Sequence, residues 1–303
     1  MYLSPCKRVL TQLPMETRTF YTLGNYEAAI SSVSSAVQPD EFELISLVWK
    51  SILRVEGDVS KCAQFWGQCA CPSELLKKSL MIWSKVFKGV GSSICTGQTT
   101  PTANTPTSTS ADLMAAQEIA IKAHESAEID PLERDQVILT CAETALLLNS
   151  TEAAFNLLKL VKASNLDCQV MFIEILLRLG QVDLARGRLE KMKNIPEWKD
   201  DVRFLLTEAQ IGLNIDTSDN DYSCVFTPKD SLYSYQELIQ IHGQTPRLLL
   251  FSAAAYILLG KFQEAQNSLL QISEKYQSDP IVKANIVVLS ALLNSSTFDS
   301  LLK

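Results

Sequence analysis

Apolar residues recur along this chain at intervals of three and four, which is the period of one face of an α-helix. Short segments with this period are separated by a recurring turn, in which a glycine or asparagine is followed five positions later by an alanine. The turn is clearest at Gly260 and Ala265 in LGKFQEA, and related turns are LGNYEAA, LGQVDLA and LNSTEAA, which contain Gly24, Gly180 and Asn149. This pattern predicts antiparallel pairs of amphipathic helices.

The residue types in the turn have a physical reason. A glycine or asparagine ends the first helix in a left-handed conformation that other residues adopt at a higher cost. The bulky residue two positions later fills the gap between the helices, and the alanine lets their backbones approach. One such pair cannot bury its apolar faces alone, so we expect each pair to stack on its neighbours.

The spacing of the turns indicates the class of helix pair. Asn149 and Gly180 lie 31 residues apart, and Gly24 lies 33 residues before Gly57, which belongs to a weaker copy of the turn in EGDVSKC. Both intervals are close to the roughly 34-residue period of tetratricopeptide (TPR) repeats, and residues 249–280 read as one complete repeat. The sequence therefore predicts an all-α, TPR-like α-solenoid of stacked antiparallel helix pairs, as a single array over residues 1–303.

The same periodicity locates the individual helices. Two breaks interrupt it: residues 91–110, rich in threonine, serine and proline, are predicted to form a disordered insertion, and residues 216–228 a polar loop. The expected helices cover residues 10–23, 26–37, 42–56, 58–69, 73–89, 111–128, 132–147, 151–163, 166–179, 182–193, 197–213, 229–242, 246–259, 262–276, 279–293 and 296–302.

Composition supports a chain of helices with buried faces and solvated backs. Hydrophobic residues make up 47% of the sequence, yet the mean hydropathy is only +0.07. No apolar run reaches the roughly 20 residues of a membrane helix, and the N-terminal MYLSPCKRVL has no hydrophobic signal core, so we expect a cytoplasmic protein. The net charge of -7 argues against a nucleic-acid partner, because phosphates call for clustered lysine and arginine.

One basic stretch, residues 178–193, could still suggest an anion-binding surface. It contains three arginines and two lysines, but Asp183 and Glu190 are interspersed among them. On a helix, this mixture is typical of a solvated back. We therefore interpret the stretch as an exposed helix face.

No pattern in the sequence indicates catalysis or metal binding. The two histidines, His124 and His242, have no nucleophile or carboxylate partner set by a motif, and His242 is expected at a helix C-terminus, where positive charge is favourable. The eight cysteines lack the paired spacing of a zinc site and are expected to be free, packed thiols. The four tryptophans are interpreted as core or groove residues. We expect no enzyme activity, no metal and no cofactor.

Stacked helix pairs curve, and the first helix of each pair lines the concave face. In the N-terminal repeats, this face would mix aromatic, aliphatic and arginine side chains, which dominate the binding hot spots of protein interfaces. An alternative is that these residues only fill a tight superhelix. The predicted partner-binding residues are Arg18, Tyr21, Leu44, Leu47, Ser51 and Arg54.

Four segments of the chain resemble the epsilon subunit of coatomer. They are FYTLGNYEAAI at 20–30, CQVMFIEILLRLGQVDLARGRLEKMK at 168–193, SLYSYQELIQIHGQTPRLLLFSAAAYILLGKFQEAQNSLLQ at 231–271, and the following DPIVKANIVVLSALLN. The stretch from Leu176 to Lys193 is the most specific, because generic repeats seldom share its sequence.

This resemblance implies a non-enzymatic structural subunit of the COPI vesicle coat. Members of that family bind the C-terminal domain of the coatomer alpha subunit, and their N-terminal repeats encircle a protruding hairpin of it. The implied location is cytoplasmic and peripheral on Golgi membranes and COPI-coated vesicles. Membrane association would then come through the coat and not by direct insertion.

The alternative function is a TPR adaptor or co-chaperone that captures short peptides in its concave groove. Adaptors that clamp a peptide carboxylate need lysine, arginine and asparagine at set inner positions. The inner face here offers Arg18 and Arg54 but no full set.

Overall fold

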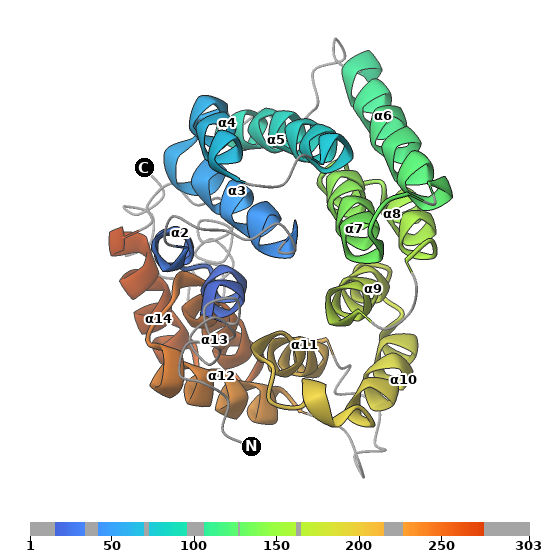
Figure 1. Cartoon of the computed structure of the whole chain (residues 1–303). Coiled ribbons are helices and arrows are strands. Elements are labelled where there is room, and N and C mark those ends of the chain that lie inside the picture. The colour runs from blue at the N-terminus through green and yellow to red at the C-terminus, as the bar shows by residue number, and fades with distance from the viewer. Residues whose placement is uncertain are drawn as a thin grey trace, which may run out of the picture. The chain divides into compact units, whose positions relative to one another are not determined.

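The computed structural model of the chain describes residues 16–33, 42–69, 73–95, 106–126, 128–161, 165–214 and 227–275. Every regular element in these ranges is helical (Figure 1). The chain divides into two compact units, Met1–Cys168 and Gln169–Lys303. The predicted all-α, TPR-like fold of antiparallel helix pairs is confirmed, and the single continuous array remains a prediction.

The first described element of the first unit is a helix over residues 16–23, which precedes the first labelled helix. Helix α7 lies at its centre, in contact with α3, α5, α6 and α8. The labelled helices of this unit are α2 (Tyr26–Ser32), α3 (Phe42–Glu56), α4 (Val59–Gln68), α5 (Glu74–Cys95), α6 (Pro106–Glu125), α7 (Pro131–Leu147) and α8 (Thr151–Leu158).

The second unit continues from α9, near whose start the division falls. Successive helices from α11 onward pack on one another in sequence order. The elements are α9 (Leu166–Arg178), α10 (Val182–Lys193), the 3-10 helix η1 (Pro196–Trp198), α11 (Val202–Leu213), α12 (Pro228–His242), α13 (Pro246–Leu258) and α14 (Phe262–Lys275).

Several helices start where a short polar side chain can bind a free backbone N–H group. The side chain of Asp201 accepts a 2.9 Å hydrogen bond from the backbone nitrogen of Arg203 at the start of α11. At the start of α12, Thr227 and Asp230 form a reciprocal capping box. These caps satisfy donors that would otherwise lack a partner inside the helix.

The predicted turn has one repeated backbone geometry. Gly260 has φ +71°, its N–H donates to the carbonyl of Ile257, and the N–H of Lys261 donates to the carbonyl of Tyr256, five residues earlier. This is the Schellman arrangement, which satisfies the last carbonyls of the first helix. The same five-residue hydrogen bond joins Asn25 to Phe20, Ser150 to Ala145 and Gln181 to Leu176.

In each of these turns, the residue just before the hydrogen-bond donor has a positive φ, as predicted. Gly24 and Gly180 have φ +82° and +70°, and Asn149 has φ +56° in the turn that lacks glycine. The weaker turn is confirmed as well, since Gly57 has φ +67°. The four turn alanines are completely buried where the helices meet: Ala29, Ala154, Ala185 and Ala265.

The structure corrects the prediction for residues 91–110 at both of its ends. Helix α5 continues to Cys95 and helix α6 begins at Pro106, so within this segment only residues 96–105 lie outside the described ranges. Proline at the first position of a helix has a favourable φ and loses no hydrogen bond. Apolar periodicity did not predict the last turn of α5 or the first turn of α6, because these helix ends consist mostly of small and polar residues.

Other boundaries differ less. The predicted helix 197–213 is divided, because η1 ends at Trp198 and Asp201 caps a new helix at Val202. Helix α2 ends at Ser32 and α8 at Leu158, earlier than predicted. The predicted helices 279–293 and 296–302 lie outside the described residues, as does most of the predicted polar loop at 216–228.

Candidate functional site

Arg54, near the end of α3, lies among four aromatic rings of the first unit. Its guanidinium carbon is 4.8 Å from the ring centre of Tyr26, 5.2 Å from that of Tyr21, 5.7 Å from that of Phe87 and 5.9 Å from that of Trp83. Cations are attracted to the faces of aromatic rings within about 6 Å. We call these five residues the Arg54 cluster.

The charge on Arg54 is maintained despite its surroundings. Burial of the guanidinium lowers its pKa, but Tyr21, Tyr26 and Glu143 outweigh that effect and raise the pKa above its ordinary value. Part of the compensation is a 2.6 Å hydrogen bond that Nη1 of Arg54 donates to the hydroxyl of Tyr26. The cluster is therefore a fixed, charged and aromatic element.

Arg18, on the helix over residues 16–23, is held by Glu43 of α3. Nη2 of Arg18 donates a 2.6 Å hydrogen bond to one carboxylate oxygen, and Nε lies 2.5 Å from the other. Such a two-point pair fixes the orientation of both side chains. Both arginines of the predicted partner surface thus have partners within the first unit.

The six predicted partner-binding residues divide by exposure. Leu44 is 3% exposed and Ser51 is fully buried, with its hydroxyl donating to the carbonyl of Leu47 at 2.8 Å. These two side chains contribute to packing in the first unit. The accessible part of the predicted surface consists of four half-buried residues, Arg18, Tyr21, Leu47 and Arg54, and the structure brings Tyr21 and Arg54 together.

A second polar set on α3 was missed by the sequence analysis. Lys50 is 1% exposed and forms a 2.7 Å ion pair with Glu143 of α7, and its ammonium lies 5.7 Å from the ring centre of Trp83. Ser46, one turn earlier, accepts a 2.6 Å hydrogen bond from the side chain of Gln136. These contacts join α3 to α7 through buried polar groups.

A signal for this set exists in the sequence. Ser46, Lys50 and Arg54 follow one another at intervals of four, which places them on one stripe of α3. The stripe lies within LISLVWKSILRV, where nearly all other positions are apolar. A polar stripe inside an otherwise apolar helix indicates buried polar partners.

The basic stretch at 178–193 is paired locally, in agreement with a solvated helix back. Arg178 lies 2.7 Å from Glu174, and Lys193 lies 3.0 Å from both Glu190 and Glu208. Arg188 donates to Gln169 at 2.7 Å, and its guanidinium carbon lies 4.1 Å from the ring centre of Phe172. Acidic residues therefore pair with Arg178 and Lys193, while Arg188 contacts neutral groups.

Burial shifts the Cys62 and Cys141 thiols and His242 toward their uncharged forms. Burial raises the pKa of the Cys62 thiol to about 11 and that of Cys141 to about 12, which opposes thiolate formation. His242 lies in the last turn of α12, as predicted. Burial lowers its pKa, so its imidazole carries less positive charge at this helix end than the sequence analysis expected. The described part of the chain contains no group of three or more histidine, cysteine or acidic residues arranged for a metal.

Within the described ranges, no helix is both long and apolar enough to cross a bilayer.

Comparison with known proteins decides the family. The family model of the coatomer epsilon subunit matches residues 89–300. The chain belongs to the coatomer epsilon subunit family. Coatomer subunit epsilon of Dictyostelium discoideum is 31% identical to it over 117 residues, which are 39% of this chain and 36% of that protein. The match thus spans little more than a third of the relative.

A structural comparison adds little to this. The crystal structure of the P58(IPK) TPR domain is 13% identical, with 97% of this chain and 99% of that chain covered and a TM-score of 0.23. That score is too low for the likeness to support an argument.

The predicted partner surface, from Arg18 to Arg54, lies before the segment matched by the family model.

Proposed function

We propose that this chain is a non-enzymatic structural subunit of the COPI vesicle coat. In this role it binds and stabilises the C-terminal domain of the coatomer alpha subunit in transport between the Golgi and the endoplasmic reticulum. The observation that carries the proposal is the match of the coatomer epsilon family over residues 89–300. Helix pairs that expose extended surfaces suit a scaffold role.

The proposed contact surface is the accessible part of the N-terminal face. Tyr21 and Arg54 belong to residue types that dominate binding hot spots, and Leu47 adds an aliphatic side chain. The contacts within the Arg54 cluster fix the Tyr21 ring before any partner arrives. A preorganised side chain loses less conformational entropy on binding, which favours affinity.

The alternative, an adaptor that captures peptide carboxylates, has less support. Its two candidate cations are engaged within the chain, Arg18 by Glu43 and Arg54 by Tyr26. A peptide carboxylate would have to compete with these contacts. A folded partner that covers the aromatic and aliphatic surface does not have to compete with these contacts.

The location follows from the same proposal. As a coat subunit, the chain is cytoplasmic and peripheral on Golgi membranes and COPI-coated vesicles. It reaches the membrane through its coat partners.

Calorimetry with the purified C-terminal domain of the alpha subunit tests this function. The double variant Tyr21→Ala with Leu47→Asp should weaken binding at least about tenfold, because it removes an aromatic anchor and places an unpaired carboxylate in an apolar contact. Lys159→Ala, at an exposed position of the first unit, is the control and should bind normally. Full affinity of the double variant, with its helix content intact by circular dichroism, would remove this surface assignment.

The coat assignment has a separate test. The tagged chain, recovered from native cytosol, should bring down the other coatomer subunits in equal amounts. Recovery of chaperones without coatomer subunits would favour the adaptor.

A further inference from the structure

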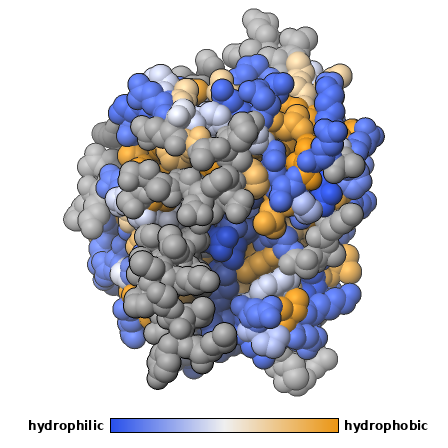
Figure 2. Space-filling model, in the orientation of Figure 1, coloured by the Kyte–Doolittle hydropathy of each residue, from blue (hydrophilic) through white to orange (hydrophobic). Residues whose placement is uncertain are grey.

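Helix α6 packs inward through small residues and leaves large apolar ones outside. Ala116, Ala120 and Ala123 are at most 1% exposed, on the helix that contacts both α5 and α7. Met114 and Ile121 of the same helix are 65% and 47% exposed. In Figure 2, apolar side chains reach the surface on the side where Figure 1 draws α6 and α7. Exposed apolar surface of this kind marks interaction sites.

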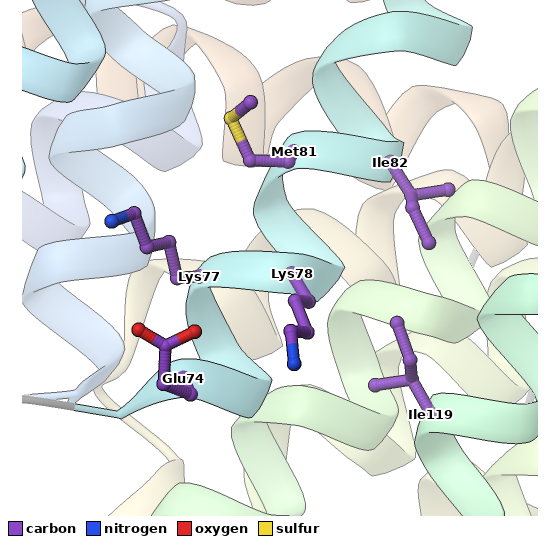
Figure 3. A pocket seen from close by; sticks show the side chains of 6 residues that line it. All are labelled: Glu74, Lys77, Lys78, Met81, Ile82 and Ile119. Carbon is purple, nitrogen blue, oxygen red and sulfur yellow. The ribbon is translucent and has the colours of Figure 1, made fainter.

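A groove lies beside this face, between α5 and α6. Its hollow measures about 480 Å³, and Figure 3 shows Ile82 of α5 and Ile119 of α6 pointing toward one another across it. Met81, which also lines the groove, is 45% exposed. An open hollow with an apolar lining fits a row of side chains from a helix.

The edge of the groove is positively charged. Lys77 and Lys78 line it beside Glu74, and α5 as a whole carries four lysines and one glutamate in a chain with a net charge of -7. Lys85 is paired with Asp112 at 2.7 Å. Among the described residues, Lys77 and Lys78 have no ion-pair partner.

We propose that this α5–α6 groove, formed by Met81, Ile82 and Ile119 with Lys77 and Lys78 at its edge, is a docking site for an acidic amphipathic helix of a partner protein. Apolar side chains spaced three and four apart fill the hollow, and flanking carboxylates face the two lysines. The site shares no residue with the N-terminal surface and does not depend on the alpha-subunit proposal.

The shape of the site favours a helix over a membrane. A peripheral protein meets a bilayer with apolar groups that insert into it, whereas Ile82 and Ile119 face each other within a hollow. Glu74 lines the same hollow beside the two lysines, so its edge carries charges of both signs. A helix can match both signs, since one basic residue on it can pair with Glu74 while its carboxylates face the lysines, whereas an anionic headgroup surface matches only the lysines.

Fluorescence anisotropy with a synthetic peptide tests the proposal on the full chain. The probe is a fluorescein-labelled peptide of about five helical turns, with leucine at every third or fourth position, one lysine placed to face Glu74, and glutamate elsewhere. It should bind at least about tenfold more tightly than the same peptide with lysine in place of glutamate. Met81→Asp combined with Lys78→Glu should weaken binding of the acidic peptide at least about tenfold.

Two control variants distinguish binding at this groove from non-specific binding to exposed apolar residues and from binding at the N-terminal surface. Leu132→Asp places a charge at another exposed apolar residue, 66% exposed at the start of α7, and should leave binding unchanged. Tyr21→Ala with Leu47→Asp should leave it unchanged as well. Loss of peptide binding in the groove variant alone, with helix content preserved by circular dichroism, supports the site.

Four results would overturn the proposal. Equal affinity for the acidic and basic peptides, or for the parent and the groove variant, removes the charge and groove assignments. Binding to phosphatidylserine vesicles that the groove variant loses, without peptide binding, assigns the face to a membrane. A dimer in sedimentation that Met81→Asp dissociates assigns it to a second copy of the chain.

Discussion

The hydroxyl of Tyr26 accepts a 2.6 Å hydrogen bond from Arg54, which lies 28 positions later in the chain. The same guanidinium contacts Trp83 and Phe87 of α5. One side chain therefore ties the first helix pair to α3 and α5. This explains why an arginine occupies the end of a helix whose other residues are mostly buried.

Replacing Arg54 with lysine should destabilise the chain by about 1 to 2 kcal/mol. Lysine keeps the charge but lacks the planar group that stacks on the rings while it donates to Tyr26. The measurement is urea unfolding followed by circular dichroism. Arg178→Lys is the matched control, since Arg178 is 46% exposed and its pair with Glu174 should contribute little. Equal unfolding midpoints for both variants would show that the cluster is not stabilising.

The Lys50–Glu143 pair should behave as a partly buried ion pair, since Lys50 is 1% and Glu143 is 31% exposed. Glu143→Gln leaves the ammonium of Lys50, 1% exposed, without its counter-charge and should cost about 2 to 3 kcal/mol. Adding Lys50→Met removes the stranded charge with a side chain of similar length, so most of that loss should be recovered. Glu118→Gln, in an exposed pair with Lys122, serves as the control. A double variant as unstable as Glu143→Gln would contradict this account.

The turns between helices could be predicted from the sequence because their chemistry is local. Gly260 and Asn149 need a left-handed conformation and Ala265 needs a close contact, and each requirement limits the residue type directly. The family could be recognised for a related reason, since its most specific segment contains one such turn.

The candidate site was less predictable because it depends on tertiary packing. Periodicity predicts which residues share a face of α3, but it does not predict which residues of other helices cover that face. Ser51 is buried and Lys50 reaches Glu143 of α7, 93 positions later. The α5–α6 groove could not be predicted for the same reason, since Ile82 and Ile119 come together only when both helices have packed. The ends of the 91–110 segment were missed because small residues give no apolar period.

Alanine substitutions at two glycines should have opposite effects on stability. In both cases, a Cβ atom would meet no other atom within 4 Å, so packing does not enter. Gly260 has φ +71°, and Gly260→Ala should cost about 1 kcal/mol. Gly187 lies inside α10, and Gly187→Ala should stabilise by about 0.5 to 1 kcal/mol. Urea unfolding measures both, and the same sign for the two would contradict the turn assignment.

Enlarging the turn alanine tests the close approach of α13 and α14. Ala265 is fully buried in a cluster with Ala253, Leu269 and Ile272, so Ala265→Leu should overpack it and cost about 1 to 3 kcal/mol. Ala63→Leu, at an exposed position of α4, should change the unfolding free energy by less than about 0.5 kcal/mol. Equal stability of the two variants would mean that the repeat register is wrong.

Thiol labelling tests the burial of the cysteines and its pH dependence. Burial raises the pKa of Cys62 to about 11 and of Cys141 to about 12, so both remain protonated at pH 8 and should resist iodoacetamide. Half-exposed Cys69 is the internal control and should react before Cys62 and Cys141. Because these folded-state pKa values exceed those of the unfolded thiols, their contribution to stability is complete below about pH 8.5 and is lost as pH rises through 11. Mass spectrometry of the labelled peptides gives each rate, and Cys141 reacting as fast as Cys69 at pH 8 would show that α7 opens readily.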